Sequence, residues 1–208
     1  MTSQWIPLIE VESAHGTREI ALATRHLTKR KIFLTGEINE ALANSFISQI
    51  MYLEEEGEAP VNIYINSPGG EVNSGLLIYD AIQACKMPVN MICTGLAASM
   101  AAIILAGGQK GRRYILKHSK MMIHEPLISR GVGGSATSIK NISDSILETR
   151  SIVNSILAEH TGKTMEEINT ATRFDNYMNA EEAIAFGICD QITKSLNIRG
   201  ERNEDYFS

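Results

Sequence analysis

Ser99 stands where an apolar run, residues 89–93, and a turn of small residues, 94–98, give way to an Ala-rich helical pattern. A serine at the start of a helix keeps its hydroxyl exposed, with backbone N–H groups pointing at the group that it attacks. A second strand-to-helix turn, residues 66–70, follows the apolar run 61–65 and offers amides that no Cβ shields. Together the two turns predict a serine nucleophile facing an oxyanion hole. The stretch Ala-Ala-Ser-Met-Ala-Ala is also typical of a tightly packed buried helix.

Such a serine needs a base that is neutral at physiological pH, for which histidine is suited, and a carboxylate that orients the base. Of the five histidines, His124 directly follows a predicted buried strand, residues 120–123, and Pro126 keeps the segment extended. Asp175 lies in a predicted connector between helices, with no capping pattern to explain it. A strand-end histidine can also bond only to a backbone carbonyl, so the residues alone leave both interpretations of His124 open.

Composition predicts one compact globular domain, because 44% of the 208 residues are apolar and a core can form without disulfides or a metal. Three cysteines, Cys85, Cys93 and Cys189, lie in apolar contexts without paired spacing, which indicates reduced thiols and a cytoplasmic protein. The net charge of −5 argues against nucleic acid as the main partner. The uncharged run 89–109 is long enough for a membrane span, but its polar and glycine residues argue against one.

Apolar runs alternate with helical patterns, which predicts an α/β fold with parallel strands. We expect strands at residues 31–34, 61–65, 89–93, 113–116, 120–123 and 188–192. We expect helices at residues 19–27, 39–56, 72–86, 99–106 and 137–160, with short ones opening at Thr164 and Asn179. In this arrangement both turns lie at the carboxyl ends of their strands, where ligands bind in such folds.

Around this domain, residues 20–193, we expect an N-terminal arm over residues 1–19 and a charged tail over 194–208. Glycine and serine predict a flexible loop over residues 128–136. The helix 137–160 carries an apolar stripe at heptad spacing. Such a helix either projects and meets its own kind or lies across the sheet, and the sequence leaves both possibilities open.

Four motifs, in order, resemble those of ClpP, the proteolytic subunit of the Clp protease, over residues 20–193. They are Tyr64-Ile65-Asn66-Ser67-Pro68-Gly69-Gly70, the stretch from Gly95 through Ala98-Ser99-Met100-Ala101, Met122-Ile123-His124-Glu125-Pro126-Leu127, and Asp175-Asn176-Tyr177-Met178 with Ala180-Glu181-Glu182-Ala183. The resemblance implies that Ser99 is the nucleophile, His124 the general base and acid, and Asp175 the orienting carboxylate. It also implies an oxyanion hole made by the backbone amides of Gly70 and Met100.

The resemblance further implies a crotonase-like head with a projecting handle helix, and heptameric rings stacked in pairs around a closed chamber. It implies a cytoplasmic serine endopeptidase that hydrolyses unfolded polypeptides supplied by a Clp-type ATPase. The partner uses ATP, whereas this chain is expected to bind no cofactor and no metal. We expect no nucleic-acid partner and no membrane association.

The chain departs from the family pattern at several positions. Phe174 stands before the triad aspartate where arginine is usual, and Glu125 stands where glutamine is common. Aromatic residues of the family's ATPase-docking pocket are absent at Asn62 and Ala84, although Tyr64 remains. These changes predict a specialised paralogue that mixes with a second ClpP-type subunit. Two alternatives are a catalytically idle ring subunit and a crotonase-type acyl-CoA enzyme, which would not need a Ser-His-Asp set.

Overall fold

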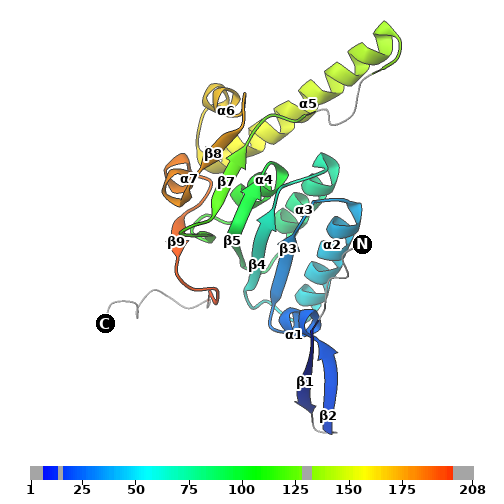
Figure 1. Cartoon of the computed structure of the whole chain (residues 1–208), viewed down its shortest axis with the longest axis vertical. Coiled ribbons are helices and arrows are strands. Elements are labelled where there is room, and N and C mark those ends of the chain that lie inside the picture. Colours follow the sequence, from blue (N-terminus) through cyan, green and yellow to red (C-terminus); the bar gives the residue numbers. More distant parts are fainter. Residues whose placement is uncertain (1–6, 14–15, 128–132, 199–208) are drawn as a thin grey trace.

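The computed structural model describes residues 7–13, 16–127 and 133–198. Its strands are β1 (Leu8–Ser13), β2 (Gly16–Ala21), β3 (Lys31–Thr35), β4 (Val61–Ser67), β5 (Val89–Ala98), β6 (Arg113–Leu116), β7 (Lys120–Ile123), β8 (Asn176–Met178) and β9 (Gln191–Thr193). Its helices are α1 (Leu22–Thr28), α2 (Glu40–Glu55), α3 (Val72–Ala84), α4 (Met100–Ala106), α5 (Ala136–Thr161), α6 (Met165–Ala171) and α7 (Ala180–Phe186). The predicted alternation of strands and helices is confirmed (Figure 1).

The central sheet is mostly parallel. Its strands follow the order β3-β4-β5-β6-β9, and each neighbouring pair is parallel. Beyond the part of β5 that pairs with β6, the end of β5 pairs in parallel with β7, and β7 pairs antiparallel with β8. Because β4, β5 and β7 run in the same direction, the segments that follow them emerge at one edge of the sheet.

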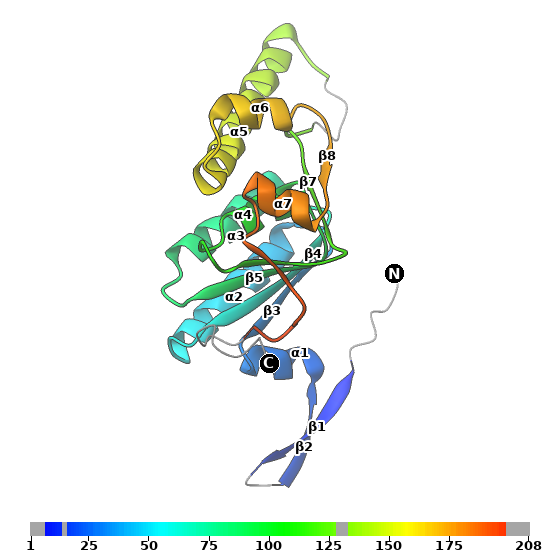
Figure 2. The same ribbon diagram turned by 90° about the vertical axis from the view of Figure 1, so that its left-hand side faces the viewer.

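Helix α3 packs against both α2 and α4. Helix α2 contacts β3, and α4 contacts β4 and β5. The three helices form a layer beside the sheet in Figure 2. The predicted apolar face of α2 is confirmed, since Phe46, Ile50 and Leu53 are buried and Leu42 packs against the core. Its predicted cap is also confirmed, because the Asn39 side chain accepts a hydrogen bond of 3.0 Å from the Leu42 amide.

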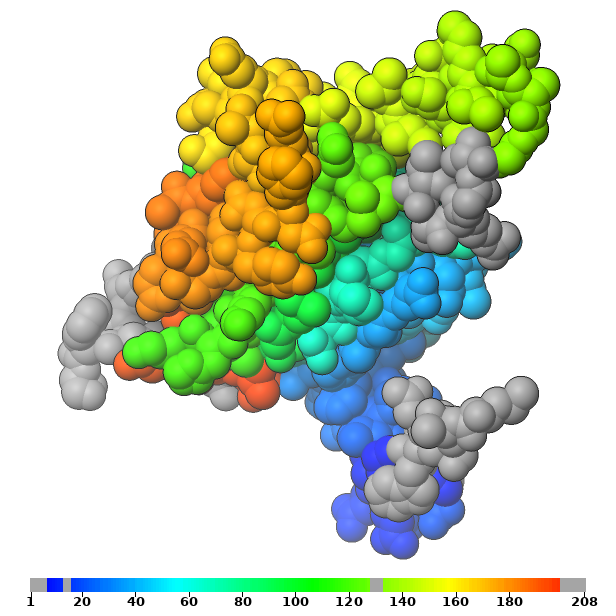
Figure 3. Space-filling view, turned by 45° about the horizontal axis from the view of Figure 1, so that its top comes forward, coloured from blue at the N-terminus to red at the C-terminus, as the bar shows by residue number. Residues whose placement is uncertain are grey.

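The N-terminal arm forms a β-hairpin, which the sequence analysis did not predict. Strands β1 and β2 pair antiparallel, with Leu8 opposite Ala21, and the hairpin protrudes from the head in Figures 1 and 3. The predicted helix 19–27 begins later than expected, at Leu22, because the preceding residues belong to β2. The hairpin therefore crosses residue 19, where we expected the arm to end.

Strand boundaries differ from expectation at three further places. The predicted turn over residues 94–98 is strand, because the end of β5 pairs with β7. The predicted connector before residue 179 contains the short strand β8, which pairs with β7. The last strand is shorter than the predicted 188–192 and begins at Gln191. Each difference arises from pairing with a strand that is distant in the sequence.

Helix α5 projects from the head (Figures 1 and 2). Its buried residues lie towards its C-terminal end and are Val153, Asn154, Ile156 and Leu157. Ile139 and Leu147, earlier in the helix, are 46% and 55% exposed. Of the two arrangements left open by the sequence, the projecting one is therefore observed. The predicted flexible loop before the helix lies partly outside the described residues, at positions 128–132.

The described part of the predicted tail, residues 194–198, lies against the start of the sheet. The Lys31 ammonium donates a hydrogen bond of 2.6 Å to the Asn197 side chain, and the Asn62 amide donates one of 3.2 Å to the Ile198 carbonyl. These contacts attach the segment to β3 and β4. The rest of the tail, residues 199–208, lies outside the described residues.

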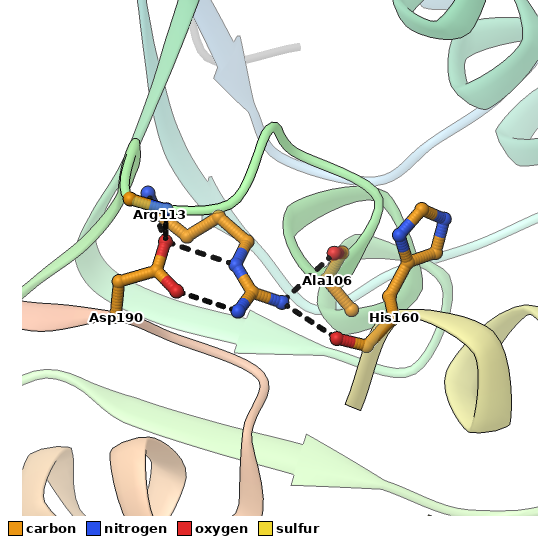
Figure 4. A network of polar contacts seen from close by, with 5 residues as sticks. Ala106, Arg113, His160 and Asp190 are labelled. Carbon is orange, nitrogen blue, oxygen red and sulfur yellow. Dashed lines mark hydrogen bonds and ion pairs between the residues drawn. The ribbon is translucent and has the colours of Figure 1, made fainter. Parts of the chain in front are cut away.

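Arg113 and Asp190 form a buried ion pair that joins β6 to the segment before β9 (Figure 4). The guanidinium donates hydrogen bonds of 3.1 and 2.6 Å to the two carboxylate oxygens. It also donates one of 3.2 Å to each of the carbonyls of Ala106 and His160. The pair thus connects the sheet with the C-terminal ends of α4 and α5.

The three cysteines are free and buried, as their apolar contexts predicted. In the part of the chain that the structure describes, no helix is both long and apolar enough to cross a membrane. Among the same residues, no group of three or more His, Cys, Asp and Glu side chains could hold a metal ion.

Candidate active site

Ser99, His124 and Asp175 meet in a chain of hydrogen bonds. The Ser99 Oγ lies 2.9 Å from the His124 Nε2, and the His124 Nδ1 lies 3.1 Å from an oxygen of Asp175. With the ring proton on Nδ1, the imidazole donates to the carboxylate and accepts from the hydroxyl. The histidine therefore contacts a side chain on each side and is not a strand-end histidine bonded only to backbone.

The backbone at Ser99 has the strained geometry of a sharp strand-to-helix turn. Its φ and ψ are 54° and −127°, whereas a non-glycine residue rarely has a positive φ. The residue follows β5 directly and caps α4 without a side-chain capping bond. The hydroxyl is thus free of a capping role and points to the imidazole.

Strand pairing brings His124 to Ser99. Ala98 at the end of β5 lies opposite Met122 in β7, and the Ser99 amide continues the pairing with a bond of 2.8 Å to the Met122 carbonyl. His124 comes two residues later, at the same edge of the sheet. The local sequence of neither strand predicts that His124 lies near Ser99, because this contact depends on the pairing of β5 with β7.

Strand β8 brings the carboxylate to the other side of the imidazole. In the antiparallel pair of β7 and β8, Ile123 lies opposite Asn176, so the next residues, His124 and Asp175, are adjacent. A second link joins the same segments, since the Glu125 amide donates a bond of 2.7 Å to the Thr172 carbonyl. The connector that carries Asp175 is therefore held by backbone bonds on both sides of the carboxylate.

Gly69 and Gly70 form the turn that packs between Ser99 and Ile38. A Cβ on Gly69 would lie 2.7 Å from the Cβ of Ser99, and one on Gly70 would lie 2.1 Å from the Ile38 carbonyl oxygen. Both glycines have positive φ values, 91° and 155°. Only glycine fits this approach of one turn to the other.

Two backbone amides are candidate donors at this turn, those of Gly70, which follows the glycine packed against Ser99, and of Met100, which follows Ser99. The bridge between Ile38 and Gly70 uses the Gly69 carbonyl and the Glu71 amide, so the Gly70 N–H points away from Ile38. Met100 is the first residue of α4, and its N–H consequently has no acceptor within the helix. These amides could donate to an oxygen that develops negative charge beside Ser99.

The site is partly open to solvent. The His124 side chain is 14% exposed, and that of Asp175 is 57% exposed. A nucleophile, a base and an orienting carboxylate within hydrogen-bond reach can carry out acyl transfer.

His160, in contrast to His124, lies outside this set of contacts. It bonds to the Tyr79 hydroxyl at 2.8 Å. Burial lowers the pKa of His160, although Glu159 opposes that effect.

The sequence analysis did not identify Arg150, Asn154 and Thr172, which contact the segments that carry the base and the carboxylate. The Arg150 Nε lies 3.1 Å from an oxygen of Glu125, and the Asn154 amide donates a bond of 3.3 Å to the Thr172 hydroxyl. Arginine in a long amphipathic helix resembles any solvent-facing charge, so no local signal could have distinguished Arg150.

A comparison with protein families found a match that agrees with the fold and spans every candidate site residue. The family model described as Clp protease matches residues 14–196. This span contains Gly70, Ser99, Met100, His124 and Asp175. The mostly parallel sheet flanked by helices is compatible with the crotonase-like fold expected for that family. With most of its length matched, and with a ClpP-type arrangement of strands and helices, the chain belongs to the Clp protease family.

Proposed function

We propose that the chain is a serine endopeptidase subunit that hydrolyses peptide bonds of unfolded polypeptides. The main support is the continuous set of contacts from the Ser99 hydroxyl through His124 to Asp175, with distances of 2.9 and 3.1 Å. These distances lie within or close to hydrogen-bond reach for a nucleophile, its base and the group that orients the base.

In the proposed reaction, His124 Nε2 takes the proton of the Ser99 hydroxyl as Oγ attacks the carbonyl carbon of the peptide. The tetrahedral intermediate collapses when the C–N bond breaks, and His124 gives the proton to the leaving amine. A water molecule then attacks the acyl-enzyme with His124 again acting as base, which releases the carboxylic acid and restores Ser99. Asp175 keeps the imidazole oriented and stabilises its protonated form.

The amides of Gly70 and Met100 would form the oxyanion hole in this reaction. Met100 follows Ser99, and Gly70 follows Gly69, which packs against the Ser99 side chain. The peptide oxygen becomes negatively charged only during the attack. Donors positioned in advance therefore stabilise the transition state more than the bound substrate. Each such donor is typically worth about 100- to 1,000-fold in rate.

The assembly is also part of the proposal: heptameric rings, stacked in pairs, enclose the site in a chamber supplied by a Clp-type ATPase. Family membership and the exposed apolar side chains of the projecting helix α5, including Ile139 and Leu147, support it. We propose that the chain itself binds no cofactor, because proton transfer and nucleophilic attack use its own side chains, and that ATP is used by the partner. The proposed compartment is the cytoplasm, with the free, buried cysteines as support.

A fluorophosphonate probe tests the hydrolase proposal directly. The assembled wild-type protein should become covalently labelled, and Ser99→Ala should abolish labelling. Ser48→Ala is a matched control, since the exposed Ser48 hydroxyl lies in α2, away from the site, and donates to the Asn44 carbonyl of the same helix. Unlabelled wild type would instead favour the catalytically idle ring subunit. An acyl-CoA enzyme, the third candidate, should hydrolyse or hydrate a thioester without labelling at Ser99.

Exposed Phe174 supports the proposed mixing with a second ClpP-type subunit. Its side chain is 75% exposed beside the catalytic carboxylate, and the neighbouring Arg173 lies 5.6 Å from its ring. An apolar side chain cannot make the ion pair between rings that the resemblance to ClpP implies for an arginine at this position. Sedimentation of the purified chain tests this: a homogeneous and fully active double ring would show that no second subunit is needed.

A further inference from the structure

The handle helix α5 contacts the segment that carries the proposed base. Arg150 lies in α5, and its Nε is 3.1 Å from the Glu125 carboxylate. The two side chains are 32% and 37% exposed, but the Nε atom itself is buried, and among the described residues this ion pair is its polar contact, since it makes no hydrogen bond. Since Glu125 follows His124 directly, the ion pair fixes the backbone next to the imidazole.

One turn later in the same helix, Asn154 contacts the segment that carries Asp175. Its buried amide donates bonds of 2.8 Å to the Asn169 side chain and 3.3 Å to the Thr172 hydroxyl. Residues four apart share one helix face, so a single face of α5 holds both segments. The bond from the Glu125 amide to the Thr172 carbonyl joins these segments to each other.

From these contacts we propose that Arg150 is a positioning residue that acts through Glu125 to keep His124 within reach of Ser99. The inference rests on the function proposed above and adds to it a residue in α5 that touches none of the reacting atoms. Arg150 differs in this respect from the three triad members. Its loss should change the orientation and protonation of the base without removing any reacting group.

The charges around the pair predict how that loss appears. Glu125 and Arg150 line a pocket of about 530 Å³ together with Glu166, Asn169, Thr170 and Arg173. Its two carboxylates and two guanidinium groups balance, and the additional charge that faces the imidazole is Asp175. Removing Arg150 leaves the carboxylate of Glu125, the residue that follows His124, without its counter-ion. Negative charge favours the protonated imidazole, which cannot act as a base.

The test compares four forms of the assembled full chain: wild type, Arg150→Gln, Glu125→Gln and the double variant. Fluorophosphonate labelling rates and peptide hydrolysis are measured across pH. Arg150→Gln should lower the labelling rate roughly 10- to 100-fold, the range expected for a misplaced catalytic group. It should also move the acid limb of the pH–rate profile to higher pH. The double variant should return that limb to its wild-type position, because no unbalanced carboxylate remains.

Lys140→Gln is the matched control, since Lys140 forms an exposed ion pair with Asp144 in the same helix. It should leave the labelling rate and the pH profile unchanged. The proposal is overturned if Arg150→Gln keeps the wild-type rate and profile, or if it behaves as Lys140→Gln does. It is also overturned if the double variant keeps the displaced acid limb.

A readout that does not need activity separates this inference from the proposed function. Imidazole ¹⁵N resonances of His124, assigned with His124→Gln, should shift in Arg150→Gln and stay in place in Lys140→Gln. Wild type that is unlabelled and inactive would refute the hydrolase proposal. The resonances would still decide the positioning role, and an unmoved His124 signal in Arg150→Gln would refute it.

Discussion

Replacing Asp190 with alanine should lower the free energy of unfolding by about 3–5 kcal/mol, the usual effect of breaking a buried ion pair. The Arg113 side chain is 4% exposed and would keep a charge without its counter-ion. The same carboxylate accepts backbone bonds of 2.7 Å from Gly111 and 2.9 Å from Arg113. The substitution thus leaves two amides and a guanidinium without their acceptor.

Most of the expected loss comes from the charge that remains. In the double variant Arg113→Met with Asp190→Leu no charge is buried, so the loss should be smaller than that of Asp190→Ala, although the amides of residues 111 and 113 still lack their acceptor. Asp144→Ala is the control. Asp144 is 56% exposed and pairs with the 73% exposed Lys140, and exposed pairs contribute about 0–1 kcal/mol.

The pH dependence provides a second measurement on the same pair. Burial raises the pKa of Asp190, but hydrogen bonds from the Arg113 side chain and from the amides of Arg113 and Gly111 outweigh burial and hold the pKa below its ordinary value. A folded-state pKa below the unfolded value of about 3.9 means that the pair stabilises fully above that pH. The stabilisation is lost as the pH falls through the folded-state pKa.

Urea unfolding at equal protein concentration, at neutral pH and then in steps into the acid range, measures both effects. The difference between wild type and Asp190→Ala should be constant at and above pH of about 5 and should shrink below about 4. A loss at neutral pH no larger than that of Asp144→Ala would refute the reasoning. A difference that grows on acidification would also refute it.

Three further predictions concern the site and the core. Asp175→Asn should lower kcat by about 1,000- to 10,000-fold, because an amide cannot stabilise the imidazolium and favours the wrong tautomer, and peptide hydrolysis measures this. Gly70→Ala should abolish hydrolysis or folding, because its Cβ would lie 2.1 Å from the backbone of Ile38, and circular dichroism with fluorophosphonate labelling separates the two outcomes. Burial raises the pKa of all three thiols, Cys85, Cys93 and Cys189, so a chromogenic disulfide reagent should react with them only after unfolding.

Local signals in the sequence predicted the helices well. Thr164 and Asn179 open α6 and α7, as expected, and both helices begin with a capping box. Gly162 and Gly187 end α5 and α7 in the left-handed conformation, with φ values of 74° and 99°, as glycines after helices commonly do. These features depend on neighbours within one helical turn, so they can be recognised without knowledge of the fold.

The strands that were missed depend on distant partners. The hairpin of β1 and β2 protrudes from the head, and none of its described side chains is fully buried. Strand β8 is three residues long and exists through its pairing with β7. The extension of β5 to Ala98 has the same cause. Strand pairing over a long sequence separation leaves little local signal.

By itself, the sequence determined the residue types of the triad, the glycines beside the serine and the order of strands and helices. Only the tertiary structure brought His124 within 2.9 Å of Ser99, which is 25 residues away in the sequence, and within 3.1 Å of Asp175, which is 51 residues away. It alone also placed Arg150 of the projecting helix against the residue that follows the base. The physical reason is that β7 pairs with β5 on one side and β8 on the other, and hydrogen bonds between strands join segments that no local preference connects.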